Sequence, residues 1–260
     1  MNPGFAAACL SLAAFAVAPG TGAAATCTAS SGARTAALVE LYTSEGCSSC
    51  PPADRQLGAL STALDPGALA VPLALHVAYW DELGWRDPFA QRVFDERQRT
   101  LARANGLRSV YTPGFFVSGV EARRWPAALR ESVRAVNARP AAATIRLSSR
   151  TAGTDRLELA VHADAGPERA GASLYVAVTE SGLASKVARG ENGGATLAHD
   201  HVVRTLIGPI ALEHGRADAR REIALPAAWR RERLSVVAFV QDAREGRVLQ
   251  ALSAPACAGA

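Results

Sequence analysis

The sequence predicts an α/β N-terminal domain followed by a β-rich C-terminal domain of antiparallel, sandwich-like strands. An apolar run, a turn, two cysteines and a helical pattern follow one another over residues 36–63. After residue 140, short strand-like segments recur at regular spacing with no long helical pattern between them. The chain of 260 residues is long enough for two such domains, which we place at 36–139 and 141–257.

The N-terminal domain is organised around residues 38–60. An apolar run ends in a turn, Cys47 and Cys50 follow with two serines between them, and Pro51 opens a pattern that suits a helix. Free N–H groups at a helix start stabilise a thiolate, and the two-residue spacing lets one sulfur resolve a mixed disulfide formed by the other. The pair therefore predicts a redox dithiol in which Cys47 attacks and Cys50 resolves.

Two alternatives remain open for Cys47 and Cys50: a permanent structural disulfide, and half of a metal site. The metal reading lacks a second Cys-x-x-Cys to complete it. Proline is tolerated only in the first turn of a helix, which points to a helix start near Cys50 and leaves the activation of Cys47 in doubt.

The other N-terminal elements follow in order. Residues 26–35 are small and polar and predict a linker, whereas residues 71–77 are apolar without alternation, as in a strand buried on both faces. An aromatic, acidic loop comes next. We then expect a helix from Pro88 to about Ala104, a strand at 115–117 and a last helix at about 125–138.

The C-terminal domain is predicted from six short segments punctuated by Gly, Asp and Pro. They are residues 144–147, 157–162, 173–179, 202–206, 221–225 and 234–241.

The composition indicates a packed globular protein with 49% hydrophobic and 20% charged residues. The net charge of +4 is spread along the chain and carried almost wholly by arginine, with Lys186 as the only lysine. Without a basic block, we expect no nucleic-acid partner.

The first 25 residues read as a secretory signal. They carry no charged side chain, and an apolar stretch is followed by small residues that suit cleavage after about Ala25, although a basic residue near Met1 is missing. The stretch is too short and too interrupted by Gly and Pro for a membrane span. We therefore expect an exported protein, periplasmic or secreted, with no membrane span; lipid attachment at Cys27 is the rival reading.

Cleavage of a signal would leave four cysteines, which allow three pairings in an oxidising compartment. If Cys47 pairs with Cys50, then Cys27 and Cys257 remain near the two ends of the mature chain, and chain ends often lie close together. We predict a disulfide between Cys27 and Cys257, with two unpaired thiols on frayed ends as the alternative.

The order β-α-β-α-β-β-α, with the cysteines at the first helix and a proline before a later strand, resembles the thioredoxin fold. That resemblance implies a cis bond between Thr112 and Pro113, with the backbone there holding a substrate chain beside the disulfide. It also implies that Glu40, on the strand leading to the cysteines, relays the proton of the resolving cysteine. The alternative for Glu40 is a solvent-facing carboxylate or one paired with an arginine.

Four segments look like successive blocks of one family: VELYTSEGCSSCPPAD, HVAYWDELGWRDPFA, LRSVYTPGFFVSG and GENGGATLAHDHVVR. On these blocks the chain resembles the secreted thioredoxin-like family catalogued as domain of unknown function 1223. The resemblance covers most of the chain after the signal, but the family has no agreed activity and therefore supports fold and compartment more than function.

The loop after the second strand is a candidate substrate wall. Sites in open α/β sheets gather at the carboxyl ends of strands, where both the cysteines and this loop lie. The loop residues that we expect to contact substrate, together with Thr112, are Tyr79, Trp80, Asp81 and Trp85. The alternative is a packed loop with both tryptophans in the core, and for His76 we favour a core position.

A polar cluster stands in the second domain, at Glu191–Asn192 and at His199–Asp200–His201. A His-x-His strand can place two imidazoles on one face, as copper and zinc ligands require. A hydrogen-bonded loop against the first domain is the favoured reading, and the family pattern lacks histidine at the position of His201.

The sequence therefore predicts an exported thiol-disulfide oxidoreductase without a cofactor, acting on an unidentified protein or small thiol. The main alternative is a non-catalytic thioredoxin-like binding module whose Cys47–Cys50 bridge is structural. Metal handling through these cysteines and the His199/His201 pair is a third, weaker reading.

Overall fold

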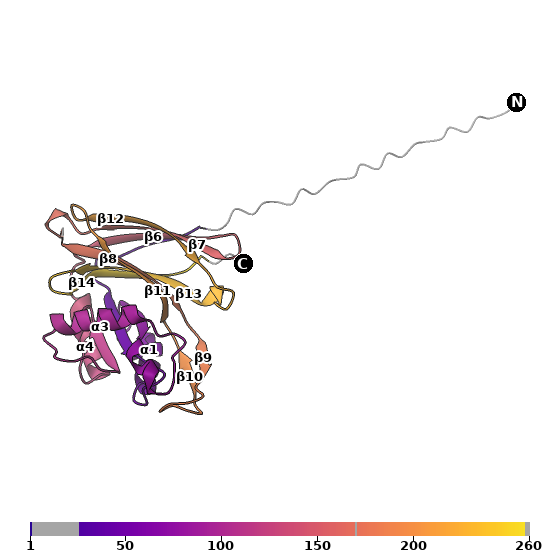
Figure 1. Cartoon of the computed structure of the whole chain (residues 1–260). Coiled ribbons are helices and arrows are strands. Elements are labelled where there is room, and N and C mark those ends of the chain that lie inside the picture. Colours follow the sequence, from indigo (N-terminus) through magenta and orange to yellow (C-terminus); the bar gives the residue numbers. More distant parts are fainter. Residues whose placement is uncertain (2–25, 170, 258–260) are drawn as a thin grey trace.

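The computed structural model describes residue 1, residues 26–169 and residues 171–257. The predicted signal segment thus lies, apart from Met1, outside the described residues. The architecture is mixed α/β and strongly β-rich, with extensive antiparallel pairing. Figure 1 shows the helices gathered at one end of the molecule and the long strands of the second half stacked at the other.

A mixed sheet of eight strands runs through the whole molecule, in the order β14-β13-β8-β11-β3-β2-β4-β5. β2 and β3 are parallel, β4 is antiparallel to β2, and β5 closes that side as an edge strand. The strands of this half are β2 (Ala37–Thr43), β3 (Ala70–His76), β4 (Gly114–Val117) and β5 (Val120–Glu121).

The same sheet continues into the second half of the chain. β3 joins β11 in parallel at the pair Ala74–Val202, and Ala74 N–H donates to the carbonyl of His201 at 2.9 Å. The sheet therefore crosses the expected boundary near residue 140 without a break. The strands of this half are β8 (Ala172–Glu180), β11 (Val202–Ala211), β13 (Leu234–Asp242) and β14 (Val248–Pro255), all paired antiparallel to one another.

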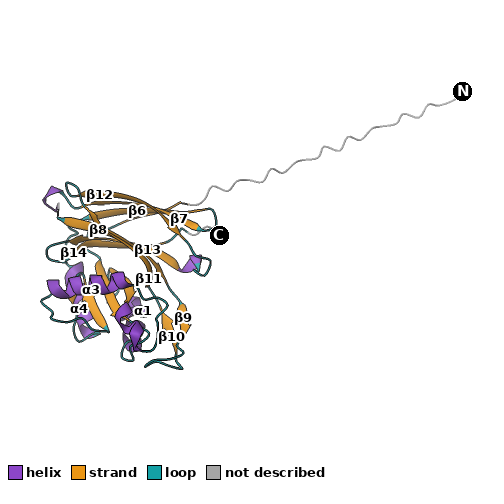
Figure 2. Cartoon of the chain, viewed as in Figure 1, coloured by secondary structure: helices purple, strands orange, loops and turns teal. Residues whose placement is uncertain are grey.

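Helices cover both faces of the β2–β3–β4 part of the sheet (Figure 2). Alternate residues of β2 point to opposite faces. Val39 and Leu41 pack in one cluster with α1 and α4, while Leu38 and Tyr42 pack in another with α3. Every residue of β2 is buried, as expected for a strand covered on both faces. The helices are α1 (Pro51–Gly58), α2 (Leu60–Ala63), α3 (Arg92–Ala104) and α4 (Ala127–Asn137).

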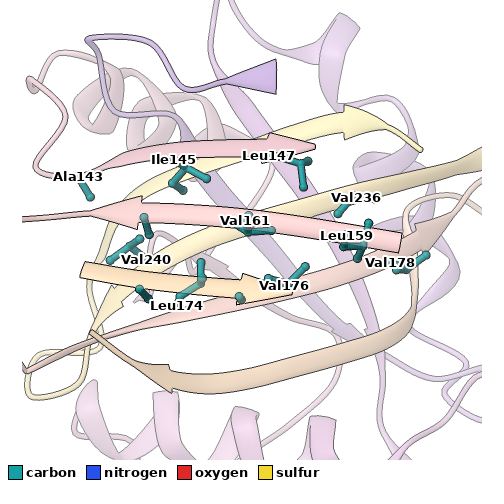
Figure 3. Packing of buried hydrophobic residues seen from close by; sticks show 14 of the residues in the cluster. Ala143, Ile145, Leu147, Leu159, Val161, Leu174, Val176, Val178, Val236 and Val240 are labelled. Carbon is teal, nitrogen blue, oxygen red and sulfur yellow. The ribbon is translucent and has the colours of Figure 1, made fainter. Parts of the chain in front are cut away.

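A second sheet of four antiparallel strands, in the order β1-β6-β7-β12, packs on the second half of the large sheet. Its two central strands, β6 and β7, alternate buried residues with more exposed ones, and the buried aliphatic side chains of both sheets form the core between them (Figure 3). Its strands are β1 (Thr26–Ser30), β6 (Thr144–Ala152), β7 (Arg156–Asp164) and β12 (Arg216–Ala224). Residues 26–30, predicted to be linker, are thus a strand that pairs with β6.

The remaining elements are short. A hairpin of β9 (Leu183–Lys186) and β10 (Thr196–His199) reaches back from the second half toward α1 (Figure 1). The 3-10 helices are η1 (Ala78–Leu83), η2 (Pro167–Arg169) and η3 (Arg231–Arg233). The helix expected from Pro88 begins only at Arg92, because residues 88–91 form a turn and an extended segment.

Cys27 in β1 and Cys257 after β14 form a disulfide across 230 residues of chain. Cys257 is also held by β6: its N–H donates to Ser149 Oγ at 3.2 Å, and its carbonyl accepts from Thr151 Oγ1 at 2.5 Å. Two disulfides in one chain indicate a non-cytoplasmic, oxidising environment. In the described part of the chain, no helix has the length and apolarity needed to cross a membrane.

Candidate functional site

The cysteine pair lies in the turn between the end of β2 and the start of α1. Cys47 and Cys50 form a disulfide, and Cys50 is the residue immediately before the helix, whose first two positions are Pro51 and Pro52. The helix therefore starts at the prolines, and Cys47 lies outside it in a turn in which Cys50 N–H donates to the Cys47 carbonyl.

This helix start changes the chemistry expected at the cysteines. Prolines have no N–H, and the N–H groups of Ala53 and Asp54 both donate to the carbonyl of Cys50 at 2.8 and 3.1 Å. The first turn of α1, which is described in full, thus leaves no free backbone N–H to stabilise a thiolate. The Cys47 sulfur has a polar neighbour in Ser49, whose Oγ lies 3.3 Å from Cys47 Sγ.

The Thr112–Pro113 peptide bond is cis, which confirms the expected bond geometry. Pro113 precedes β4, and the next residue, Gly114, pairs with Tyr42 one residue before β2 ends. The register therefore brings Pro113 to the same end of the sheet as the cysteine turn. Its part in substrate positioning stays a proposal.

The aromatic loop flanks the cysteine turn. Trp80 Nε1 donates to Thr112 Oγ1 at 2.8 Å, and a side chain added at Gly46 would meet Trp80 Cβ at 3.4 Å. Trp85 Nε1 donates to Glu45 Oε2, also at 2.8 Å. The loop thus links the cysteine turn to the residue before the cis proline.

Tyr79 and Asp81 are likewise engaged within the protein. The Tyr79 hydroxyl donates to Gln98 Oε1 at 3.2 Å, and Asp81 Oδ1 accepts from the N–H of Asp87 at 3.1 Å. The four candidate loop side chains are all half-buried. Their position beside the cysteines is compatible with a substrate wall, which stays a prediction.

Glu40 does not lie on the side of the sheet that carries the cysteine helix. Its carboxylate accepts from Arg97 Nε at 2.6 Å and from the Tyr42 hydroxyl at 3.2 Å, and Arg97 belongs to α3 on the opposite face from α1. The arginine-paired alternative is therefore what the structure holds. A proton relay from Glu40 to Cys50 does not fit this geometry, and we do not propose it further.

A buried polar network lies under the cysteine turn, centred on Glu45. Glu45 Oε1 lies 3.0 Å from His199 Nε2, and Glu45 N–H donates to Asp87 Oδ2 at 2.8 Å. Asp87 Oδ2 also lies 2.7 Å from His76 Nδ1, and the rings of His76 and His199 meet edge to face at 5.0 Å. All four side chains are almost completely buried.

Four polar atoms of this region are buried without a hydrogen-bond partner: His76 Nε2, His199 Nδ1, Thr43 Oγ1 and Asp54 Oδ1. Thr43 and His76 are paired at the ends of β2 and β3, and Asp54 is four residues beyond Cys50, on the same side of α1. Glu45 and Asp54 were not recognised from the sequence, where one reads as a turn residue and the other as part of a helix surface.

The polar cluster of the second half meets the cysteines directly. Asn192 Nδ2 donates to the carbonyls of Glu45 and Cys47 at 2.9 and 3.0 Å, and Ser48 N–H donates to Glu191 Oε2 at 2.9 Å. The favoured reading, a loop hydrogen-bonded to the first half, agrees with these contacts.

The His-x-His reading does not hold. β10 ends at His199, and His201 lies beyond it with a φ of +58°, so strand alternation does not place the two rings together. Over residues 26–169 and 171–257, no three His, Cys, Asp or Glu side chains are grouped to hold a metal ion.

The model of a family described as proteins of unknown function, DUF1223, matches residues 38–241, which span the cysteine turn, the aromatic loop and the hairpin. The chain belongs to this family. No curated protein sequence matches the chain.

Two solved structures are similar to this member of the family. The crystal structure of protein AGR_C_4864 from Agrobacterium tumefaciens is 25% identical, with a TM-score of 0.59, and the match covers 86% of this chain and 95% of that one. HBP35 of Porphyromonas gingivalis is 16% identical, with a TM-score of 0.65 over 86% of this chain and 76% of that one, a likeness of fold alone.

Burial and the pairing of His76 with Asp87 determine the protonation of these two side chains in the buried network. Burial alone would raise the pKa of Asp87, but His76 and the N–H groups of Glu45 and Phe89 outweigh it and lower that pKa. Burial opposes protonation of His76, yet Asp87 raises the pKa of His76 above its ordinary value. The pair thus favours an imidazolium beside a carboxylate.

Asp54 is a carboxyl group of this region whose ionised form burial disfavours. Burial raises the pKa of its carboxyl, and His76 and His199 offset only part of that rise. An aspartate of the unfolded chain ionises near pH 4. Because the folded-state pKa is higher, the folded protein binds more protons than the unfolded chain as pH rises from about 4 through the folded pKa, and stability falls across that window.

We therefore expect Asp54→Asn to be more stable than wild type at pH 7, because it removes the cost of an ionised buried carboxyl. The advantage should shrink as the pH falls through the raised folded pKa of Asp54 and should be lost below about 4, where Asp54 is protonated in both states. Urea unfolding of both proteins at pH 7 and pH 3 measures this difference. Equal stability of the two proteins at pH 7 would contradict the expectation.

Proposed function

We propose that this protein is an exported thiol-disulfide oxidoreductase with a thioredoxin-like unit at residues 36–139. The observation that carries the proposal is the Cys47–Cys50 disulfide placed between the end of a central strand and the start of a helix, at the sheet end where Pro113 precedes β4. Further support comes from the strand order β3-β2-β4-β5 with helices on both faces.

In the oxidised form, a partner thiolate attacks Cys47 Sγ, and the bond to Cys50 breaks. Cys50 leaves as a thiolate, which takes up a proton, and the partner is held to Cys47 by a mixed disulfide. A second partner thiolate then attacks the partner's own sulfur and releases Cys47. Two electrons and two protons have moved from the partner dithiol to the cysteine pair, and the reverse reaction uses the same atoms.

The helix start favours the reducing end of the known range of potentials. Strong oxidants of this class owe their high potential to a stabilised thiolate in the reduced form. Here the first turn of α1 supplies no free N–H to such a thiolate, because of Pro51, Pro52 and the bonds to the Cys50 carbonyl. We expect a potential nearer to roughly −270 mV than to −120 mV.

A second candidate function is a binding module whose bridge is structural. It is favoured by the burial of both sulfurs, since Cys47 and Cys50 are only 1% and 0% exposed. A structural bridge has a potential below about −300 mV and no exchange activity.

Redox titration of the purified mature protein in glutathione and thioredoxin-couple buffers separates the two candidates. A potential within roughly −270 to −120 mV supports the oxidoreductase, and a value below about −300 mV supports the module.

We expect Cys47→Ser to abolish exchange with a model disulfide and to form no mixed disulfides. The matched variant, Cys50→Ser, should instead accumulate them, because its attacking sulfur remains and its resolving sulfur is lost. Non-reducing electrophoresis after incubation of the reduced variants with an oxidised, disulfide-containing substrate protein measures both, because the Cys47 thiolate attacks the substrate disulfide and displaces one of its sulfurs. Equal trapping by the two variants would argue against the assigned roles.

A further inference from the structure

Cys47 is buried although the two residues that follow it are exposed. Its exposure is 1%, whereas Ser48 and Ser49, the two residues between the cysteines, are exposed. Exchange requires a thiolate to approach a sulfur, so a sulfur this deeply buried cannot react in the observed arrangement. A segment that packs around Cys47 must therefore move before a thiolate can reach the disulfide.

The β9–β10 hairpin is bound to the cysteine turn through its tip, residues 187–195. Three side-chain hydrogen bonds join the tip to the cysteine turn: two from Asn192 to the carbonyls of Glu45 and Cys47, and one from Ser48 N–H to Glu191. The carboxylate of Glu191 accepts from Ser48, which lowers the pKa of Glu191 and keeps it ionised at neutral pH. Each bond therefore ties a tip side chain to a backbone group of residues 45–48.

The backbone hydrogen bonds of the tip are internal to the hairpin, with Val187 N–H donating to the carbonyl of Ala195 and Gly194 N–H donating to the carbonyl of Val187. Gly190 and Gly194 take φ values of +78° and +87°, which other residues rarely adopt, and Gly190 packs closely on Trp85.

The base of the hairpin, by contrast, is fixed. His199 is paired with Glu45 in the buried network, and Gly182 N–H donates to Asp200 Oδ1 at 2.8 Å. The base is thus joined to the buried network, whereas residues 188–194 meet the cysteine turn through the side-chain hydrogen bonds of Glu191 and Asn192 and through the packing of Gly190 on Trp85.

We infer that the tip of the β9–β10 hairpin is a gate over the Cys47–Cys50 disulfide, held shut by Asn192 and Glu191. A partner gains access by breaking the three side-chain bonds, which releases two carbonyls and one N–H of the cysteine turn. The gate protects the disulfide from small thiols until a partner lifts the tip. Its purpose rests on the proposed function, but its test measures a rate and not a potential.

We expect Asn192→Ala to speed reduction of the Cys47–Cys50 disulfide by dithiothreitol about thirtyfold, the effect of losing two neutral hydrogen bonds from the closed state. Glu191→Gln should speed it by a smaller factor. The matched control is Thr196→Ala, an exposed position on β10 with no contact to the cysteine turn among the described hydrogen bonds. Timed alkylation and peptide mass spectrometry of folded protein measure the freed thiols.

The Cys27–Cys257 disulfide is read in the same samples as an internal reference. A faster Cys47–Cys50 reaction with an unchanged terminal disulfide supports the gate, and a wild-type rate in Asn192→Ala overturns it. If both disulfides react faster in Asn192→Ala, that variant reports unfolding, and Glu191→Gln decides, with a wild-type rate rejecting the gate. A potential below about −300 mV would remove the oxidoreductase without altering these rate ratios.

Discussion

Replacing Glu40 with glutamine is expected to lower the free energy of unfolding by about 3–5 kcal/mol, the usual cost of leaving one buried charge without its partner. The Glu40 carboxylate is fully buried, and Arg97 Nε donates to it at 2.6 Å. Burial would lower the pKa of Arg97, but Glu40 outweighs it and holds that pKa above its ordinary value. The guanidinium therefore stays charged, and glutamine cannot neutralise it.

Other contacts hold the Arg97 guanidinium in its buried position when the Glu40 carboxylate is removed. Its Nη1 donates to Gln241 Oε1 at 3.1 Å, and its guanidinium lies 4.9 Å from the ring centres of both Tyr175 and Phe239. These partners belong to β8 and β13, so the ion pair joins α3 to strands from both halves of the chain. Urea unfolding at pH 7 followed by circular dichroism measures the change.

A double-mutant cycle provides the control. Arg97→Met should be destabilised to a similar extent, because it strands the Glu40 carboxylate, whereas Glu40→Leu combined with Arg97→Met should recover part of the loss. Additive losses in the double variant would contradict a direct ion pair.

The same Glu40→Gln variant tests the proton-relay idea that the thioredoxin resemblance suggested. Because Glu40 faces α3 and not α1, the variant should keep the wild-type reduction potential of Cys47–Cys50. A change larger than about 30 mV, equivalent to roughly 1.4 kcal/mol for a two-electron couple, would show that Glu40 acts on the cysteines after all.

Local patterns predicted the parts of the fold that depend on neighbouring residues. The unbroken apolar run in β3 predicted a strand buried on both faces, and the Pro51–Pro52 pair indicated a helix start after Cys50. The alternating segment 157–162 likewise lies in β7, where every second residue is buried. Periodicity and proline chemistry act over a few residues, so one sequence reveals them.

The missed features depend on contacts between distant segments. Glu45 and His199 are 154 residues apart, and nothing near either residue distinguishes a buried partner from a turn residue. β1 has a polar sequence and becomes a strand by pairing with β6. The polar cluster at residues 191–192 and 199–201 predicted a loop against the first half, but the short strands β9 and β10 lack an apolar run, so the sequence did not show that this loop is a hairpin bound to the cysteine turn.

Glu40 illustrates the same limit inside one strand. Its place in an apolar run fits a proton relay and an ion pair equally well. Strand alternation shows that the Glu40 side chain points to one face of the sheet, but it does not show which helix covers that face. Arg97, 57 residues later on α3, settles the question. The thioredoxin resemblance suggested a proton relay for Glu40, whereas the structure pairs Glu40 with Arg97.

Removing the terminal disulfide with the double variant Cys27→Ser, Cys257→Ser is expected to destabilise the protein by about 5 kcal/mol, the largest loss we anticipate. The bridge closes a loop of 230 residues, and the entropy that a disulfide removes from the unfolded chain grows with loop length, reaching about 4.7 kcal/mol at 100 residues. Urea unfolding of both proteins without reductant measures the difference. The variant should retain the wild-type potential of Cys47–Cys50, which lies in a separate turn.

Ser149→Ala is the matched control for this loss. It removes the hydrogen bond from Cys257 N–H to Ser149 Oγ but keeps the disulfide, so we expect a loss of only about 1 kcal/mol. β1 also pairs with β6 over five residues, and this ladder holds the same end of the chain without any covalent bond. A loss below about 1 kcal/mol in the cysteine variant would contradict the expectation, because it would mean that the disulfide removes little entropy from the unfolded chain, as when that chain keeps residual structure.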